Sequence, residues 1–362
     1  MLISTEILVK TARLILIYGG LTILLLGMFG SLMVIIIFNY YPLNENPFSI
    51  YIRVIGILSF LFLPIYFLPN IVTFGFEINW LALNGTFCKF QMSYAVFTIT
   101  SIFILNCFIS FNRYSIISSS PQIRSFNSIK LSRYLVCGAL IIIWFAFGMP
   151  VVILFDNVPQ ENLNGTAICT SRSRALLLFA ALFYFPLLEG VLPILLAIYF
   201  WYITRKLVKR LNNQHVIQRF DRQITRTYMF QIAGNAIASL PFATINLYRS
   251  LTMEKKRSEN EENVVQFLRL LAICLFYVQY STDFYIYMIT SSEFRMRACH
   301  ILSFWHHFRR YWNNRVVQAQ KQFVKQTNLR ELSSNYRQLC QRFRQWSKLY
   351  IFIWCSPLKQ HH

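Results

Sequence analysis

Charged residues are scarce in this chain, and acids are the scarcest. Only 14% of its 362 residues are charged, whereas a soluble domain averages about 25%. Hydrophobic residues make up 56%, and the mean hydropathy is +0.44. This composition excludes an ordinary soluble domain and predicts a membrane protein. The 35 Lys and Arg against 14 Asp and Glu would also suit a nucleic-acid partner, but they lie between apolar segments, so we expect a lipid bilayer partner and no nucleic acid.

Catalytic and metal-binding motifs are also missing. The chain has no His-Glu-x-x-His, no Gly-x-Ser-x-Gly and no Cys-x-x-Cys, the patterns that mark zinc hydrolases, serine hydrolases and redox or zinc sites. We therefore expect no enzyme, no metal and no cofactor. Internal repeats are absent too, which weighs against a secondary transporter, because transporters are usually built from paired repeats.

Long apolar runs are abundant. Each exceeds the ~20 residues that a helix needs to cross the hydrocarbon layer, and lipid forces such runs to satisfy their backbone groups as helices. The sequence predicts an all-α membrane protein, a seven-transmembrane helix bundle. Its spans are 14–38, 50–74, 86–112, 133–155, 175–203, 224–250 and 263–290.

The rest of the chain divides around this bundle. Residues 1–13 form a short N-terminus, 14–290 the membrane domain, 291–312 a membrane-surface helix and 313–362 a basic tail. The surface helix is predicted from apolar residues that recur at helical spacing among basic ones, a pattern typical of helices on anionic leaflets. Cys299 lies in it and is a candidate for palmitoylation.

Basic residues set the orientation of the bundle. The side that carries the C-terminal tail holds 25 of the 35 Lys and Arg, and the other side holds 10. Since Lys and Arg accumulate in cytoplasmic loops, we expect a plasma-membrane protein with its N-terminus outside and its C-terminus in the cytoplasm. Only Lys10 and Arg13, which flank the first span, oppose this orientation.

The third span carries a thiol at one end and an arginine at the other. From Cys88 to Arg113 there are 25 positions, about 37 Å of helix, which is roughly the bilayer with its headgroup zones. Cys169 falls on the same outer side as Cys88, where disulfides form. The Asn-Gly-Thr triplets at Asn84 and Asn164 lie there too and are candidate glycosylation sites.

These features resemble the rhodopsin-like family of G-protein-coupled receptors. In that family a cysteine opens the third helix and pairs with one in the second outer loop, and an acidic-Arg-aromatic triplet closes the helix. The resemblance implies a Cys88–Cys169 disulfide and a transducer site at Arg113 and Tyr114. Here Asn112 stands in place of the acid.

Two further regions carry the resemblance. The seventh span ends with Asp283 and Tyr287 at the spacing of the family's Asn-Pro-x-x-Tyr box. Asp221 lies 20 residues before Pro241, where the family keeps an acid that pairs with the third-helix arginine. The resemblance implies an Arg113–Asp221 pair that restrains the inactive state, while a snorkelling Arg113 beside an unrelated aspartate is the alternative.

The chain also departs from the family. No acid occurs between Glu45 and Glu77, so the second-helix aspartate that holds sodium is missing, and Ser239 replaces the sixth-helix tryptophan. Ala95 and Tyr277 occupy the positions of the amine-receptor aspartate and the opsin lysine, so neither an amine nor retinal is expected. Polar residues in or near the outer halves of the spans are the candidate ligand pocket, beside Ala95: Glu189, Asn246, Arg249, Gln266 and Arg269.

The sequence thus predicts a receptor that binds an unidentified extracellular small molecule or peptide within the bundle. A heterotrimeric G protein would bind its cytoplasmic face. Two alternatives remain open: a seven-helix transporter or channel, and an invertebrate-type chemoreceptor with a different transducer.

Overall fold

The computed structural model describes the chain in several ranges and as two units. The described residues are 5–40, 46–78, 85–117, 121–159, 167–171, 173–184, 218–252, 258–292 and 294–303, with scattered positions between 187 and 206. The first unit is Met1–Thr290 and the second is Ser291–His362.

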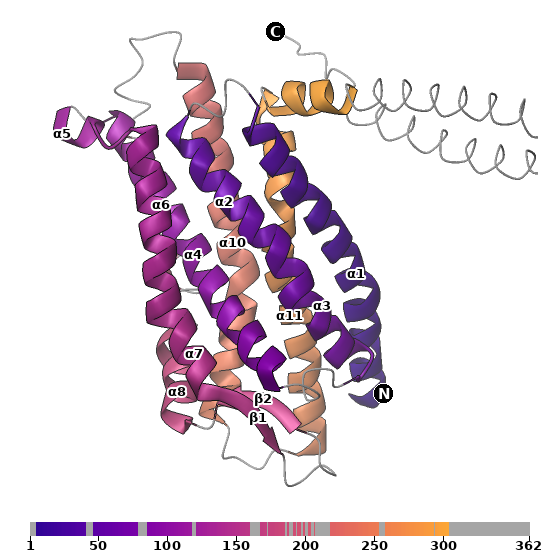
Figure 1. Ribbon diagram of the computed structural model, residues 1–362. Coiled ribbons are helices and arrows are strands. Elements are labelled where there is room, and N and C mark those ends of the chain that lie inside the picture. Colours follow the sequence, from indigo (N-terminus) through magenta and orange to yellow (C-terminus); the bar gives the residue numbers. More distant parts are fainter. Residues whose placement is uncertain are drawn as a thin grey trace, which may run out of the picture. The chain divides into compact units, whose positions relative to one another are not determined.

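Long helices make up the first unit (Figure 1). Short π-helical turns, labelled η, interrupt three of them. In chain order the elements are α1 (Thr5–Phe38), α2 (Pro47–Phe62), η2 (Leu63–Phe67), α3 (Leu68–Asn70), η3 (Ile71–Gly75), α4 (Gly85–Ile117), α5 (Pro121–Arg124), α6 (Ile129–Ile143), η5 (Trp144–Gly148), α7 (Met149–Leu154), β1 (Phe155–Pro159), β2 (Ala167–Ser171), α8 (Arg174–Phe179), η6 (Ala180–Tyr184), α10 (Gln218–Leu251) and α11 (Glu259–Thr290).

Five of the described helical segments are long and apolar enough to cross a membrane, and they coincide with five of the predicted spans. They are Ile7–Phe38, Pro47–Gly75, Gly85–Asn112, Ile129–Leu154 and Asn260–Thr290. The predicted span 224–250 corresponds to α10, which is helical throughout but more polar. The predicted span 175–203 lies only partly within the described residues.

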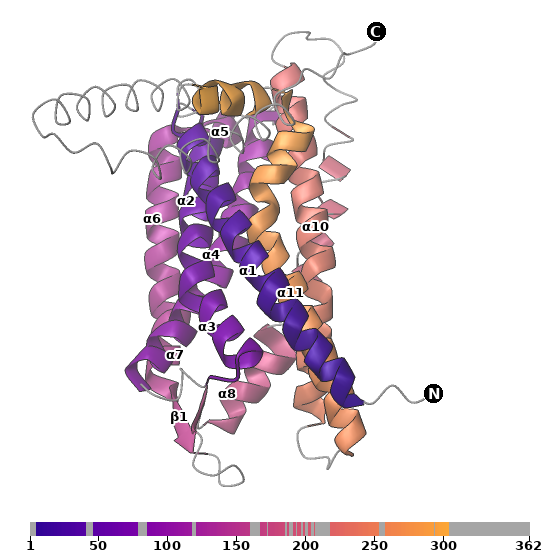
Figure 2. The ribbon, with the colours of Figure 1, turned by 90° about the vertical axis from the view of Figure 1, so that its right-hand side faces the viewer.

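Neighbouring helices pack into one bundle. In the first unit, α1 packs against α2 and α11, and α10 packs along α11. On the other side, α4 contacts α2, α6 and α7, as the two views in Figures 1 and 2 show. The start of α1 and the β1–β2 hairpin lie at one end of the bundle, and α5 lies at the opposite end (Figure 1). The segments predicted to be outside therefore share one end.

Prolines explain two of the π-helical turns. Pro64 stands within η2, and Pro150 is the second residue after the end of η5. Because proline has no N–H and clashes with the preceding turn, the helix widens locally to five-residue hydrogen bonds. The Leu68 N–H accordingly bonds to the Leu63 carbonyl. The second span therefore contains a widened turn at Pro64.

Glycines bring α1 close to its neighbours. A Cβ atom at Gly27 would lie 2.5 Å from Leu63 Cδ1 and 2.8 Å from Ser281 Cβ, and one at Gly30 would lie 3.1 Å from Phe284 Cβ. Small residues allow membrane helices to approach to backbone contact. The Gly-x-x-Gly motif of the first span therefore fixes the α1–α11 distance.

The outer surface of the bundle is apolar. Leu25, Ile142, Ile153 and Ile237 are 67 to 72% exposed. In water such a surface would favour aggregation, whereas in a bilayer it is the surface that faces lipid. The buried core lies between α1, η2, α4 and α11, where aromatic rings such as Phe62, Phe67 and Tyr277 stack.

Two features differ from expectation. The first helix begins at Thr5, whereas the sequence predicted 1–13 as a separate N-terminus. Leu8, Lys10, Ala12 and Arg13 are good helix formers, and no Gly or Pro lies between Thr5 and residue 14, so α1 starts before the predicted span. The β1–β2 hairpin was not predicted, because its two short strands lack a repeating pattern long enough to recognise.

The second unit contains a helix. Residues 294–303 are helical, in agreement with the predicted helix at 291–312 as far as the described residues extend. Phe294, Ala298 and Ile301 are buried at helical spacing, while Met296 is 63% exposed. The helix is therefore amphipathic.

Candidate functional site

A disulfide ties the third span to the β1–β2 hairpin, at the end of the bundle that is predicted to be outer. Cys88, in the first turn of α4, is bonded to Cys169 in β2, with Cα atoms 5.6 Å apart. Cys169 pairs with Asn157 across the antiparallel hairpin, so the bond pins both strands. The Lys89 ammonium also lies 3.9 Å from the Asp156 carboxylate of β1. The predicted disulfide is present, and it holds the hairpin at the end of the bundle.

A polar cluster lies in the half of the bundle that carries this hairpin, among η2, α3, α4 and α11. The Asn70 amide donates to the Tyr277 hydroxyl and to the Tyr66 carbonyl, both at 2.9 Å. The Gln91 amide donates to the same Tyr66 carbonyl at 3.4 Å, while its buried Oε1 has no hydrogen-bond partner in the described part of the chain. Tyr277, at the position of the opsin lysine, is thus a hydrogen-bonded core residue.

Arg269 borders this cluster. Its guanidinium carbon lies 4.5 Å from the centre of the Phe74 ring. Arg249, in the last turn of α10, is close enough to repel Arg269 electrostatically, and Glu262 and Tyr66 are close enough to attract it. Two of the predicted pocket residues, Arg249 and Arg269, are thus near one another.

The other predicted pocket residues are not all brought together. Ala95 is 3% exposed and belongs to the apolar core that contains Phe67 and Tyr277. Asn246 and Gln266 are half-buried on α10 and α11. Glu189 lies outside the described residues. For these positions the ligand pocket stays a prediction.

Polar contacts join α10 to α11 in the opposite half of the bundle. The Gln231 amide donates to Asp283 Oδ1 at 2.8 Å, and the Tyr287 hydroxyl donates to Gln231 Oε1 at 3.4 Å. One turn toward the inner end, the Thr227 and Thr290 hydroxyls are 2.6 Å apart. The two residues of the seventh-helix motif therefore share a single partner, which is on α10.

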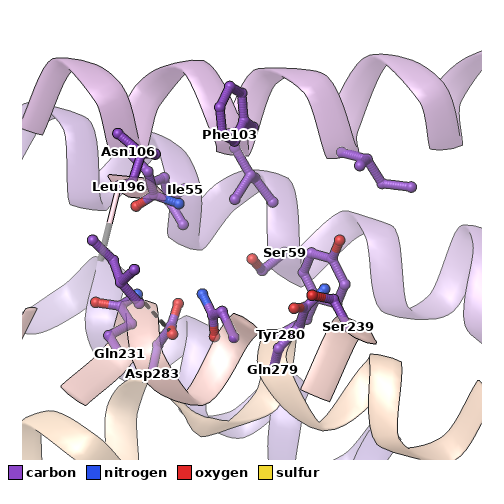
Figure 3. Close-up of a pocket in the computed structure, with 14 residues that line it drawn as sticks. Ile55, Ser59, Phe103, Asn106, Leu196, Gln231, Ser239, Gln279, Tyr280 and Asp283 are labelled. Atoms are coloured by element: carbon purple, nitrogen blue, oxygen red, sulfur yellow. Dashed lines mark hydrogen bonds between the residues drawn. The ribbon is translucent and has the colours of Figure 1, made fainter. Parts of the chain in front are cut away.

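A cavity of about 70 Å³ opens beside this network (Figure 3). Its polar lining includes Asp283, Gln231 and Ser239, from α10 and α11, and Ser59 from α2. The buried Ser59 Oγ and Asn235 Oδ1 have no hydrogen-bond partner among the described residues. Drug-sized ligands need roughly 300 Å³ or more, so this cavity is much smaller than a typical ligand site. It is a space in which polar groups can change partners.

The end of α4 that is predicted to be inner carries the predicted transducer motif. Asn112 is 2% exposed and donates to Asn127 Oδ1 at 3.0 Å, while its own Oδ1 has no partner in the described part of the chain. Tyr114 is exposed. Arg113 lies in α4 and Asp221 in α10, but both side chains are outside the described set, so their pairing stays a prediction.

Sequence reasoning missed Gln231 and Thr227. Both belong to a stripe of polar residues spaced by four on α10, namely Thr227, Gln231, Asn235 and Ser239. Residues four apart share one helix face, and polar side chains within a span usually face other helices. That spacing was the available signal.

The candidate modification sites are only partly described. Asn84 and Asn164 lie outside the described residues, so glycosylation stays a prediction. Cys299 lies in the helix at 294–303, and its sulfur is disulfide-bonded. Palmitoylation needs the free thiol, so it would require reduction of that bond and stays a prediction. Within the described residues no group of His, Cys, Asp and Glu could hold a metal ion.

The structure is that of a membrane protein of the receptor type. It has apolar membrane-spanning helices, a hairpin bonded to the third span and a polar network between the last two spans. The model of the 7 transmembrane receptor (rhodopsin family) matches residues 30–312, more than three quarters of the chain. The protein belongs to this family, and its fold is the seven-transmembrane helix bundle. No curated protein is similar enough to match the chain.

Proposed function

We propose that the protein is a G-protein-coupled receptor of the plasma membrane. Membership of the rhodopsin family is the observation that carries the proposal, because receptors of this family have an extracellular ligand and a heterotrimeric G protein as partners and are generally not enzymes. The N-terminus would be outside and the C-terminus in the cytoplasm. Asn84 and Asn164 would then lie on the outer side and be available for glycosylation.

The described contacts support ligand binding at one end of the bundle and G-protein binding at the other. At the outer end, the Cys88–Cys169 bond restrains the hairpin beside the polar cluster of Asn70 and Tyr277. At the inner end, α10 and α11 are held together by Gln231 and Asp283. The helices could adopt two packings. A ligand that binds more tightly at the outer end of one of them shifts the population toward that packing.

The G protein would bind the packing in which the inner ends of α4 and α10 separate. Arg113 would contact it, with Asn112 and Tyr114 beside it and Asp221 as the restraining acid. Asn112 carries no charge, so its contact with Asn127 cannot restrain Arg113 as an acid would. The receptor is therefore expected to have measurable activity without agonist.

The test is an Arg113→Ala variant assayed for G-protein activation in cells at matched surface expression. Basal output is expected to fall to the level of untransfected cells, whereas Asp221→Asn should raise it. Output that is unchanged by Arg113→Ala would reject the transducer assignment and favour the chemoreceptor alternative. Ion currents in ligand-free cells that express this chain alone would favour the channel alternative.

A further inference from the structure

Arg269 is a cation inside a predicted membrane span without an anionic partner in contact. It lies ten residues into α11, about 15 Å along the helix, within the span Asn260–Thr290. In the part of the chain that the structure describes, its guanidinium makes no ion pair and no hydrogen bond. Its close neighbour is the ring of Phe74, 4.5 Å away.

This arrangement is costly for the folded protein. A guanidinium has five N–H donors, and one aromatic face does not replace the hydrogen bonds that they lose in an apolar environment. Ionisable groups within spans are retained mainly where they pair or function. Arg269 therefore needs a hydrogen-bond acceptor, and the described part of the bundle does not provide one.

The charges near Arg269 define the charge of that acceptor. Arg249 and Arg269 repel each other, and Glu262 offsets one of the two positive charges. Of these three described side chains two are cationic and one is anionic, so a single further negative charge balances them. A carboxylate carries one charge, and its two oxygens match the guanidinium fork bidentately, whereas a phosphate monoester carries nearly two charges.

The surroundings favour an apolar body behind the acidic group. Phe74 stacks on the guanidinium, and the Tyr66 ring lies 6.3 Å from the Tyr277 ring. Beside them the buried Gln91 Oε1 is a free acceptor among the described residues. Ligand sites combine such apolar walls with a few polar groups that fix orientation.

We propose that Arg269 binds the carboxylate of a monoanionic ligand whose apolar body lies against Phe74 and Tyr66. The inference rests on the proposed receptor function, since it names the chemical class of the ligand for the outer site. Agonists of this receptor would then be small apolar acids, and their neutral amides would be inactive.

Binding can be measured on the purified full-length receptor in lipid nanodiscs by thermal denaturation. The probes are 3-phenylpropionate, octanoate and indole-3-acetate, each with its amide. At least one acid is expected to raise the unfolding temperature of the wild type, and its amide is not. Arg269→Gln should weaken the acid by at least tenfold, since it removes a charge-assisted bidentate contact.

A matched control removes another outer cation. Arg13 forms an ion pair with Glu77 at 2.6 Å near the start of α1, so Arg13→Gln lowers the positive charge of the same side without touching Arg269. It should leave the response to the acid unchanged. The proposal is overturned if no acid stabilises the wild type, if the amides act as well as the acids, or if Arg269→Gln responds normally.

A second variant separates a binding role from a packing role. Arg269→Met keeps a long side chain on the Phe74 ring and removes the charge. If the arginine is kept for ligand binding, the ligand-free variant should unfold roughly 2–4 °C above the wild type and no longer respond to the acid. A lower unfolding temperature with an intact acid response would show that Arg269 is structural.

These experiments separate the inference from the proposed function. Thermal denaturation needs no G protein, so Arg113→Ala should bind the acid normally. Acid binding without any signalling would reject the receptor function alone. Signalling by a neutral ligand that persists in Arg269→Gln would reject the carboxylate assignment alone.

Discussion

Gln231 is the side chain that joins α10 to α11, and its replacement by Leu is the sharpest test of the inner network. Leucine has a similar volume but removes the 2.8 Å bond to Asp283 and the acceptor of the 3.4 Å bond from Tyr287. Interhelical hydrogen bonds in membranes contribute about 1–2 kcal/mol, and the longer bond contributes less. We expect a loss of about 1.5 kcal/mol.

The loss has two measurable effects. Unfolding of the ligand-free receptor should begin roughly 3–6 °C lower, because 1 kcal/mol corresponds to about 2–4 °C in a chain of this size. If the Gln231 contacts are broken in the packing that binds the G protein, the open population rises roughly tenfold, since 1.4 kcal/mol is a factor of ten. Basal G-protein activation should rise accordingly.

Gln279 provides the matched control. It is the same residue type in the lining of the same cavity, and its side chain makes no hydrogen bond in the described part of the chain. Gln279→Leu should therefore change neither the unfolding temperature nor basal activation appreciably. Equal effects of the two substitutions, or a lower unfolding temperature without a rise in basal activation, would refute the role of the Gln231 contacts in holding the inner face closed.

Two further substitutions test the outer loop and the α1 interface. Cys88→Ser should lower stability by about 4.5 kcal/mol in the chain-entropy model for a bond that closes 81 residues. The unfolding temperature of Cys88→Ser should equal that of Cys169→Ser, and a single variant as stable as the wild type would show that the bond is not needed. Gly27→Val should destabilise the fold by roughly 1–3 kcal/mol through overpacking, because a Cβ there would lie 2.5 Å from Leu63 Cδ1. The measurement is stability in detergent. Gly138→Val is the control, since a Cβ at Gly138 has nothing within 4 Å.

The sequence predicted the features that depend on distance along one helix. The apolar lengths predicted five spans that the structure contains. The 25-residue interval from Cys88 to Arg113 predicted which end of α4 carries each, and the family resemblance supplied the Cys88–Cys169 pair. These predictions succeed because a helix has a fixed rise, and a bilayer fixes its length.

Features that depend on the rotation of one helix against another were not predicted. The stripe from Thr227 to Ser239 marks a polar face of α10, but the contact of Gln231 with Asp283 also requires knowing which side of α11 faces that stripe. The contact of Arg269 with Phe74 likewise depends on where η3 ends after two π-helical turns. Each widened turn changes the helix register, so the facing positions cannot be counted from the sequence.

The seventh span connects the two regions on which the proposals rest. Arg269 and Asp283 are 14 residues apart on α11, about 21 Å and nearly four turns, so they lie within about 40° of the same face. Because the helix is continuous between them, a carboxylate that displaced α11 at Arg269 would move the Asp283 carboxylate with it. The 2.8 Å bond from Gln231 weakens steeply when its geometry changes, so such a displacement would loosen the contact between α10 and α11. If the proposed coupling exists, binding at either end would affect the other by an equal free energy.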